Sequence, residues 1–580
     1  MPGAKMPQRW LPVDKDGWTI LKPSADSQIM YVSNAEGDDA TAQVYRPGDE
    51  AVGADATQPC GAIRPFRTIE AAMAKARDGQ PDWVLLKRGD TFDDQTIIIG
   101  SSGRSAAEPR VVGAYGASPA RPVLRGKDCH TSITLGRGND TQYAVVMGIE
   151  LYQSFMDPES PNYQKGAWRG DRNENNKSVV LIYSGKNAGI KNLLVEDCLL
   201  RFSQLICKGD ALMNNVVFRR NLVLDHYAPN GHTMGFAGVH ASILLEECIF
   251  DHCGWLLQRV AANEGKNGRA NMKSHNSYCP QMYSTIFRDS MFLRASSIHN
   301  KFTCNVGSGG VKDVVVDNNL YVEGEICLSM GGNTPGPLRW VNCEIRNNVM
   351  LDIGRSQPTG RKLAWYVHAM DWDGGEIAGN LFLRQRSDVV TNVFGLSVGC
   401  GARQEAGQTH ARNVLVRDNV FHGLNNADAA LIIQDSDYMK NLTFADNMFQ
   451  FADVPSKLVK TDALSPELKF RNNIYDSAAA PETWFMVGEK PLSFEQWVKE
   501  SGEQGARKEK IKFPDPERGI ETYMKSLGKE PTFGAFIAEV RKQSKANWRK
   551  EFTTPVINDW IREGFGVKKT AASRLAAENR

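Results

Sequence analysis

One alternation of apolar and polar positions recurs along the middle two-thirds of the chain. Each copy has alternating apolar residues, a polar pair, a small polar residue that is usually Asn, and two more apolar residues, as in VVVDNNLYV and CEIRNNVML. The small polar residue stands at Cys198, Asn221, Cys248, Ser290, Asn319, Asn348, Asn380, Asn419, Asn447 and Asn473. Alternation with period two is typical of strands, and repeats of roughly 20–50 residues are typical of solenoids. The pattern therefore predicts an all-β chain folded as a parallel β-helix of about 11–13 coils, with one copy in each coil.

The recurring Asn residues are interpreted as scaffold and not as a catalytic set. An Asn at the same corner of every coil can hydrogen-bond along the stack, and Asn tolerates the left-handed backbone conformation of a tight bend. Cys198, Cys248 and Ser290 replace it where a smaller side chain is sufficient. We therefore expect a structural ladder of amides.

Helical patterns are confined to the two ends of the repeat. FRTIEAAMAKAR at 66–77 has one apolar face and an N-cap at Thr68, which predicts a helix that covers the open end of the solenoid. Helix-start signals in the last hundred residues stand at Ser493 with Gln496, Asp515, Thr532 and Thr554. They predict a cap or a packing layer on the outside of the coils. The predicted organisation is a lead-in with capping helix at 1–94, the β-helix at 95–480, a helical extension at 481–567 and a disordered tail at 568–580.

Composition excludes several classes of function. The formal net charge of +2 gives no basic surface of the kind that binds nucleic acid, and no stretch approaches the length of a membrane-spanning helix. The 11 cysteines include no CxxC pair, so neither a zinc site nor a disulfide framework is expected. The start, MPGAKMPQRW, lacks the apolar segment of a signal peptide. We expect a monomer that is secreted or periplasmic, with its leader absent from this numbering; the alternative is a protein that stays inside the cell.

Histidines gather where the rhythm of the repeat is longest. Two successive copies lie 42 residues apart there, and six of the ten histidines fall between 226 and 299. Insertions in a solenoid become loops, and loops often carry function. Residues two apart on a strand share a face, so Lys273 with His275, and His299 with Lys301, are expected to project outward together. On neighbouring coils the two pairs would form a cationic patch.

Such a patch suits an acidic polysaccharide as substrate and partner. Positive groups neutralise a uronate carboxylate, which lowers the cost of removing the C5 proton and makes β-elimination feasible. The predicted catalytic residues are Lys273 or His275 as base, Lys301 or Arg294 as acid or carboxylate neutraliser, and His299 in support. The predicted substrate-binding residues are Asp251, His252, Trp255, Asn276, Tyr278 and Arg288. The sequence therefore predicts a polysaccharide lyase.

Two other functions stay open. Hydrolysis needs two carboxylates that flank the glycosidic bond, and Asp371 and Asp373 in YVHAMDWDGGE would share a face if the segment is extended. The same segment also fits a polar, Gly-rich turn between coils. The third alternative is a β-helix that binds glycan without turnover, in the manner of a tailspike.

Two parts of the chain resemble known proteins. The run YVSNAEGDD, PFRTIEAAMAKARDG and WVLLKRGDTF resembles the entry and capping segment of right-handed parallel β-helix proteins of the pectin-lyase-like superfamily. This resemblance implies a right-handed β-helix, and because that superfamily holds lyases, hydrolases, epimerases and tailspikes it implies no single activity.

The segment MKSHNSY to SSIHNKF loosely resembles alginate and chondroitin lyases, which use a Lys base and an Arg acid. The resemblance implies a role for Lys273 in a Lys-Ser element, and Lys301 falls near the position of the family's Arg. Those lyases also bind Ca²⁺, for which Glu323 and Glu325 would be the equivalent ligands. The cofactor expectation is therefore either none or Ca²⁺.

Overall fold

The computed structural model describes residues 5–136, 139–165, 179–186, 189–228, 231–260, 267–304, 310–331, 340–400, 411–451 and 455–568. The chain divides into two compact units. The first is Met1–Phe250 with Gly265–Gly268 and Gln543–Trp548, and the second is Asp251–Glu264, Arg269–Lys542 and Arg549–Arg580.

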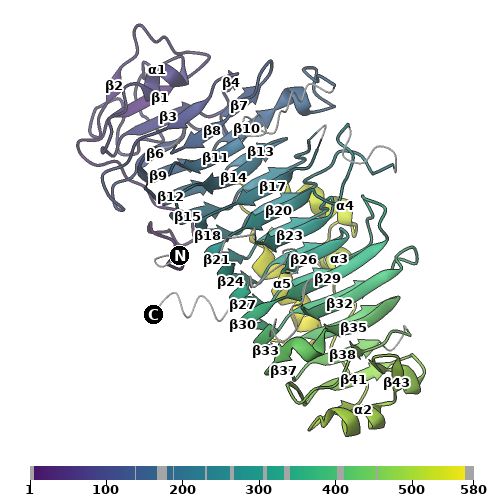
Figure 1. Cartoon of the computed structure of the whole chain (residues 1–580). Helices are drawn as coiled ribbons and strands as arrows, with labels where there is room; N and C mark the ends of the chain where they lie inside the picture. The colour runs from purple at the N-terminus through teal and green to yellow at the C-terminus, as the bar shows by residue number, and fades with distance from the viewer. Residues whose placement is uncertain are drawn as a thin grey trace. The chain divides into compact units, whose positions relative to one another are not determined.

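Strands of the first unit lie in three sheets, and each full coil gives one strand to each sheet (Figure 1). The first sheet contains β1 (Ile29–Val32), β2 (Val44–Tyr45), β3 (Trp83–Lys87), β6 (Arg110–Tyr115), β9 (Thr141–Met147), β12 (Ile190–Glu196), β15 (Met213–Arg219) and β18 (Ala241–Glu246). The second contains β4 (Thr91–Asp93), β7 (Val123–Gly126), β10 (Glu150–Gln153), β13 (Leu199–Arg201) and β16 (Leu222–Leu224), and β19 (Ile249–Asp251) follows at the end of the unit. The third contains β5 (Ile97–Ile99), β8 (Ile133–Leu135), β11 (Val179–Ser184), β14 (Gln204–Gly209) and β17 (Met234–Gly238).

The second unit repeats the three-sheet arrangement. Its first sheet contains β21 (Tyr283–Arg288), β24 (Val311–Asp317), β27 (Trp340–Arg346), β30 (Trp372–Ala378), β33 (Ala411–Arg417), β36 (Met439–Lys440), β37 (Leu442–Ala445) and β40 (Leu468–Arg471). The second contains β22 (Met291–Leu293), β25 (Leu320–Val322), β28 (Val349–Leu351), β31 (Leu381–Gln385), β34 (Val420–Leu424), β38 (Met448–Phe451), β41 (Ile474–Ser477) and β44 (Arg507–Lys508). The third contains β20 (His275–Pro280), β23 (Ile298–Thr303), β26 (Ile326–Met330), β29 (Leu363–Met370), β32 (Asn392–Gly399), β35 (Ala427–Gln434), β39 (Val459–Thr461), β42 (Phe485–Val487) and β43 (Lys490–Leu492). The parallel pairing of successive coils confirms the predicted β-helix.

The Asn residues of the second unit form the predicted ladder. Oδ1 of Asn348 accepts from the backbone N–H and from Nδ2 of Asn319 at 2.9 and 3.1 Å, and Asn348 Nδ2 donates to the Val316 carbonyl at 3.0 Å. The same contacts join Asn348, Asn380, Asn419, Asn447 and Asn473 in series. The series ends at Glu503, whose Oε1 accepts from the backbone N–H and Nδ2 of Asn473 at 3.2 and 2.7 Å. The interpretation of these residues as scaffold is confirmed.

The left-handed bend lies one residue before each ladder position, so its assignment to the ladder Asn itself is wrong. The residues that precede the ladder have φ between 51 and 63°, and they are Asp197, Arg220, Glu247, Asp289, Asn318, Asn347, Gly379, Asp418, Asp446 and Asn472. The physical reason is that the two neighbouring residues have different roles. The residue before the ladder takes the left-handed turn, which leaves the ladder residue free to direct its side chain along the stack.

The helices are α1 (Ile69–Met73), α2 (Phe494–Ser501), α3 (Ile520–Ser526), α4 (Phe533–Val540) and α5 (Thr554–Gly564), with 3₁₀ turns at Ser154–Met156, Ser436–Tyr438, Pro481–Thr483 and Lys550–Phe552. Three predicted starts are confirmed. The side chain of Thr68 caps α1, that of Thr532 caps α4, and Ser493 with Gln496 forms the capping box of α2. The predicted N-cap at Asp515 is wrong, because residues 515–518 form a separate turn and α3 begins after Gly519.

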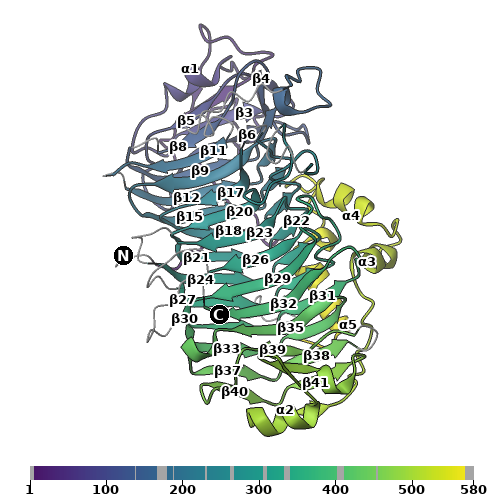
Figure 2. The same ribbon diagram turned by 45° about the vertical axis from the view of Figure 1, so that its right-hand side comes forward.

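Helices α3, α4 and α5 of the second unit lie on the outside of its coils, whereas α2 lies at the end of the stack (Figure 2). Asn558 of α5 donates through Nδ2 to the carbonyl and to the Oδ1 of Asn318, both at 3.1 Å. Arg562 of α5 donates to the Gly379 carbonyl at 2.7 Å. Both contacts reach the left-handed bends that precede the ladder, so α5 satisfies backbone groups at the corner between the first and second sheets.

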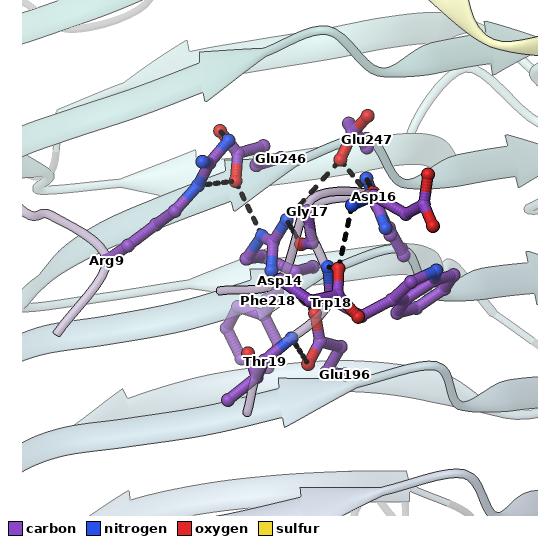
Figure 3. Close-up of polar contacts among 12 residues, drawn as sticks. Arg9, Asp14, Asp16, Gly17, Trp18, Thr19, Glu196, Phe218, Glu246 and Glu247 are labelled. Atoms are coloured by element: carbon purple, nitrogen blue, oxygen red, sulfur yellow. Dashed lines mark hydrogen bonds and ion pairs between the residues drawn. The ribbon is translucent and has the colours of Figure 1, made fainter. Parts of the chain in front are cut away.

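In the first unit, the segment around residues 9–19 packs on the outer face of the first sheet through buried charges (Figure 3). Arg9 donates to Glu246 at 2.8 and 2.9 Å, and the Thr19 N–H donates to Glu196 at 3.4 Å. Arg219, 1% exposed, binds Glu196 and Glu246 at 2.6 Å each. Burial raises the pKa of Glu196, and the charge of Arg219 opposes that rise. The network ties this segment to β12, β15 and β18.

A neighbouring arginine packs against two indole rings of the same unit, which contact each other edge to face. The guanidinium carbon of Arg220 lies 4.2 Å from the ring centroid of Trp18 and 4.5 Å from that of Trp548. Arg220 Nε also donates to Glu247 at 2.7 Å. The contacts join residues from near both ends of the sequence to the middle of the first unit.

All 11 cysteines lie in the described parts of the chain, none of them forms a disulfide bond, and nine are buried. No helix in the described parts of the chain is long and apolar enough to cross a membrane.

Candidate functional site

A row of polar side chains crosses the outer face of the third sheet in the second unit. On β23, Asn300 and Phe302 point inward, because Tyr321 Oη donates to Asn300 Oδ1 at 2.5 Å and the Phe302 ring lies 5.3 Å from that of Phe287. Lys301, between them, therefore faces outward. The parallel register places Tyr278, Lys301, Ser329, His368 and Ser397 on successive strands. We call these five residues the polar row.

A second row lies three residues earlier on the same strands and is largely apolar. It consists of Ile298, Ile326, Trp365 and Phe394. The ring of Trp365 stacks on Phe394 at a centroid distance of 5.1 Å and on His368 at 6.1 Å. Trp365 Nε1 donates to Asn392 Oδ1 at 2.8 Å, which fixes the half-buried indole. An aromatic surface of this kind beside polar groups suits a sugar ring, whose faces are apolar and whose edges are polar.

Lys301 is the most unusual member of the polar row. Its side chain is half-buried, and no carboxylate in the described parts of the chain forms an ion pair with it. Its Nζ lies 6.0 Å from the ring centroid of Tyr278. Burial lowers the pKa of Lys301 below its ordinary value, and the charge of Arg361 lowers it further. A lysine in such surroundings loses its proton more easily than one in water and can serve as a general base.

The neighbours of Lys301 on the row are held in their neutral forms. Burial, helped by the charge of Lys301, lowers the pKa of His368 to about 4, so the imidazole is uncharged at neutral pH. Burial raises the pKa of Tyr278, so its phenol keeps its proton. His275, 1% exposed, stacks on Tyr278 at 5.8 Å. The row therefore presents a weakened ammonium beside a phenol that can donate a proton.

A buried ion pair borders the two rows at the start of β26 and β29. Arg361 donates through Nε and Nη2 to Glu325 at 2.9 and 2.7 Å, and Thr359 Oγ1 donates to the same carboxylate. Arg361 Nη2 also donates to Ser297 Oγ at 2.6 Å. Because Arg361 still lowers the pKa of Lys301, its positive field reaches the polar row despite its partner.

The predicted pairing of Lys273 with His275 on one outward face is wrong. Lys273 is exposed in the turn before β20, where its backbone N–H donates to Asn271 Oδ1 at 2.9 Å, whereas His275 begins the strand and is buried. The strand starts later than the sequence pattern indicates, so the alternation does not extend to Lys273. A catalytic role for Lys273 or His275 stays a prediction.

The predicted pairing of His299 with Lys301 is also wrong. His299 is fully buried, with its Nδ1 2.9 Å from Asn276 Nδ2 and its Nε2 2.7 Å from the Glu323 carbonyl. Burial lowers its pKa to about 4. Because Asn300 also points inward, the strict alternation that would place His299 outside is broken between the two residues. Asn276, predicted to bind substrate, is likewise fully buried and positions His299.

Four of the predicted residues meet elsewhere, at the ends of β19 and β22. Arg294 donates through Nε and Nη2 to both oxygens of Asp251 at 2.8 and 2.7 Å, and Arg541 Nε donates to the same carboxylate at 2.5 Å. Trp255 Nε1 donates to the Arg294 carbonyl at 2.9 Å, and its ring lies 4.5 Å from that of His252. Arg288 lies elsewhere, on β21 of the first sheet.

The two glutamates predicted to bind Ca²⁺ do not share a site. Glu325 is buried and accepts from Thr359 and Arg361, as described above. Glu323, in the left-handed bend after β25, lies 3.4 Å from Arg355 Nε. The described residues include no group of three His, Cys, Asp or Glu that could hold a metal ion. Ca²⁺ stays a prediction without support from the donor set.

Asp371 and Asp373, the pair expected for hydrolysis, also differ in their surroundings. Asp371 has a φ of 62°, so the extended geometry that would place both on one face is broken there. Both oxygens of Asp373 accept from Arg412 at 2.6 Å each. The segment is strand β30 and not the turn that was the simpler interpretation.

Sequence reasoning missed His368, Trp365, Arg361, Ser329 and Ser397. The spacing between ladder and polar row varies from coil to coil: Lys301 lies 11 residues after Ser290, whereas His368 lies 20 after Asn348. Loops of different length separate the second and third sheets, so no constant offset could reveal the row. Only the register of the folded sheet does so.

Comparison with known proteins adds the fold alone. No protein-family model and no curated protein matches the chain. Similar solved structures include a mannuronic acid specific polysaccharide family 6 lyase from human gut microbiota, at 16% identity and a TM-score of 0.37, covering 86% of this chain and 95% of that one. They also include a GH136 lacto-N-biosidase from Eubacterium ramulus, at 13% identity and a TM-score of 0.31, covering 83% of this chain and 67% of that one. A third is a tailspike protein of E. coli bacteriophage HK620, at 12% identity and a TM-score of 0.30, covering 70% of this chain and 60% of that one.

The class that the fold defines is the parallel β-helix, which the three sheets establish by themselves.

Proposed function

We propose that the chain is a polysaccharide lyase that cleaves a uronate-containing polysaccharide by β-elimination at the polar row. The observation that carries the proposal is Lys301, a half-buried amine with a lowered pKa and no acidic partner in the described residues. Natural proteins rarely leave such a group without a function, because burying an unpaired charge is costly.

The reaction assigns a role to each neighbour. The neutral amine of Lys301 takes the C5 proton of the uronate, the C4–O4 bond breaks, and a C4–C5 double bond forms. The phenol of Tyr278 donates a proton to the leaving O4 oxygen. The positive field of Arg361 favours the substrate carboxylate and the negative charge that develops on it. Trp365 supplies a surface on which a sugar ring can stack.

This assignment changes the expected base from Lys273 or His275 to Lys301. Lys273 is exposed in a turn and His275 is covered by Tyr278. An acidic polysaccharide as substrate, and a location outside the cell or in the periplasm where such polymers occur, belong to the same proposal.

The test is a substrate panel of alginate, pectate and glycosaminoglycans, with ultraviolet absorbance of the unsaturated product as the readout. Lys301→Ala should lower the rate by about 10²–10⁴-fold, the usual contribution of a general base. Lys312→Ala is the matched control, because Lys312 is an exposed lysine on β24 of the same unit. It should leave the rate unchanged.

Other outcomes would refute elimination. If reducing ends rise without ultraviolet absorbance, the chemistry is hydrolysis, and Asp373→Asn should then abolish it. If the chain retains acidic glycan but no product of either kind forms, it is a binding protein. If Lys301→Ala and Lys312→Ala form unsaturated product equally fast, Lys301 is not the base.

A further inference from the structure

The first unit has a pocket of its own, lined by none of the residues discussed so far in connection with catalysis. Its volume is about 560 Å³, within the range of roughly 300–1,000 Å³ usual for small-molecule sites. Its floor is the outer face of the first sheet, where Leu85 of β3, Val111 and Gly113 of β6 and Met147 of β9 lie on neighbouring strands. This floor is apolar and, at Gly113, lacks a side chain.

Arg88 brings a positive charge to this pocket and forms no ion pair with any carboxylate of the described residues, although the charge of Asp197 acts on it. The residue follows β3, and its backbone N–H donates to the Tyr115 carbonyl at 2.9 Å. Its guanidinium lines the pocket, is half-buried, and forms no hydrogen bond or ion pair with any residue that the structure describes. Burial lowers the pKa of Arg88. A cation that is partly desolvated and unpaired gains most from an anionic ligand.

The acidic residues that line the pocket accept hydrogen bonds from their own surroundings. Asp197, whose charge acts on Arg88, accepts through Oδ1 from Arg121 Nη2 at 2.5 Å and from the Lys545 backbone N–H at 2.9 Å. Asp14 accepts from the backbone N–H groups of residues 16 and 18, both at 2.9 Å. Asp55 accepts from the backbone and hydroxyl of Thr57 at 2.8 Å each.

Elsewhere the same chain shows what its arginines bind. Arg125, Arg294 and Arg412 each present Nε and Nη2 to a carboxylate, at 2.6 and 2.8 Å, 2.8 and 2.7 Å, and 2.6 and 2.6 Å respectively. This edge of a guanidinium matches the two oxygens of a carboxylate. Arg88 has no carboxylate bound in this way among the described residues, and it lies beside an apolar floor. The combination fits a molecule with a carboxylate on one side and an apolar face on the other.

We infer that this pocket binds one uronate residue of an acidic saccharide and is a second, non-catalytic glycan site. The carboxylate pairs with Arg88, and the apolar face of the sugar ring lies on Met147 and Ile20, because Leu85 and Val111 are each only 1% exposed. Lys545, which also lines the pocket, adds a second positive charge. The choice of a uronate as ligand rests on the proposed function; the preference for a carboxylate rests on Arg88 alone.

The test is isothermal titration calorimetry with trigalacturonate and trimannuronate, and with maltotriose as the uncharged probe. The protein carries Lys301→Ala, so that the probe is not cleaved. We expect two binding events per chain with an acidic probe and none at this pocket with maltotriose. Arg88→Ala should remove one event or weaken it by at least about tenfold, the effect of losing a charge-assisted bidentate contact.

A second variant probes the pocket without changing its charge. A Cβ at Gly113 would lie 3.4 Å from Leu85 Cδ2 and 3.6 Å from Met147 Cγ, ordinary contact distances, so Gly113→Leu can fold and fill the floor. It should remove the same event as Arg88→Ala. Arg67→Ala, an exposed arginine in the same unit, is the matched control and should change nothing.

The outcomes separate this inference from the proposed function. If the acidic probes bind with unchanged stoichiometry and affinity when Arg88 or Gly113 is replaced, the pocket is not a uronate site, whatever Lys301 does. Equal binding of maltotriose would also overturn it. If a single event is seen and Arg88→Ala removes it, the pocket is confirmed while the site at Lys301 has failed.

Discussion

At the scale of single residues, the burial of Lys301 lowers the stability of the fold but also lowers the pKa of its amine, which favours catalysis. Its ammonium is half-buried beside Tyr278 and has no carboxylate partner in the described parts of the chain, so burial lowers its pKa below the ordinary value of 10.5. The folded state therefore binds its proton less tightly than the unfolded state does. Such a group reduces stability at neutral pH, and its retention is more easily explained by reactivity than by structure.

This effect of burial gives a prediction about stability. Lys301→Met should leave the melting temperature at neutral pH unchanged or raise it, because methionine fills similar volume without a charge. Since the unfolded lysine titrates near 10.5, wild-type stability should rise as pH increases towards that value, and the difference between the two proteins should shrink. Thermal unfolding at several pH values measures this. A marked loss of stability in Lys301→Met at neutral pH would show that the ammonium is well satisfied.

Some residue roles could be predicted from the sequence and others could not. The ladder positions were predictable because the amide recurs in a fixed phrase. His299 was misplaced because β23 breaks the strict alternation, with Asn300 also directed inward. Lys301 was correctly predicted to face outward, because the alternation holds from Asn300 to Phe302. The sequence contains no signal for Trp365 and His368. The residues beside them on neighbouring strands come from coils whose loops differ in length, so no constant spacing relates them.

At the scale of elements, the amide ladder is closed by a residue outside the phrase. Glu503, just after α2, accepts from Asn473, from Tyr475 Oη at 2.9 Å and from Trp497 Nε1 at 2.8 Å. Burial raises its pKa, and these hydrogen bonds oppose the rise. The carboxylate thus satisfies four buried donors at the end of the stack, counting both groups of Asn473.

Removing the Glu503 carboxylate should destabilise the C-terminal end of the solenoid. Glu503→Ala leaves buried donors without acceptors, which costs about 1–3 kcal/mol for each group left unsatisfied. Glu503→Gln keeps one amide oxygen and should lose less. Hydrogen exchange should show faster opening at 442–477, the adjacent strands, than at 311–351 of the same unit, because repeats are stabilised by nearest neighbours. Uniform loss of protection over both ranges would contradict this.

The helices show which element signals are reliable. Side-chain caps at Thr68, Ser493 and Thr532 fixed three starts correctly. Asp515 followed by Pro516 has the composition of a helix start, yet the chain forms a turn there. Helix α3 begins only after Gly519, which lies against the guanidinium of Arg384. The start of α3 also has a local contact, because the Gly519 N–H donates to Thr522 Oγ1 at 2.8 Å.

At the scale of the whole molecule, different kinds of segment cover the outer faces of the sheets in the two units. In the second unit, helix α5 covers a corner of the coils through Asn558 and Arg562. In the first unit, side-chain ion pairs hold the segment around residues 9–19 on the first sheet. Arg219 lies at the centre of these pairs and binds both Glu196 and Glu246. A buried ion pair contributes little net stability when intact, but losing one partner is costly.

Arg219→Met should therefore destabilise the first unit by roughly 3–5 kcal/mol, because two carboxylates stay buried without it. Arg125→Met is the matched control in the same unit: Arg125 and its partner Asp93 are 34% and 39% exposed, so its loss should cost no more than about 1 kcal/mol. Chemical denaturation measures both. Equal effects would show that water reaches the Arg219 network.

The amide ladder also has a direction. Every rung from Asn319 to Asn473 donates its Nδ2 towards the following coil and accepts from the preceding one, so the amide dipoles add along the stack as peptide dipoles do along a helix. The positive pole falls at Asn473, and Glu503 places an acceptor there. The solenoid is therefore electrically asymmetric. A further coil could be grafted after Asn473 only if it brought an acceptor of its own, whereas a coil added at the other pole would need a donor.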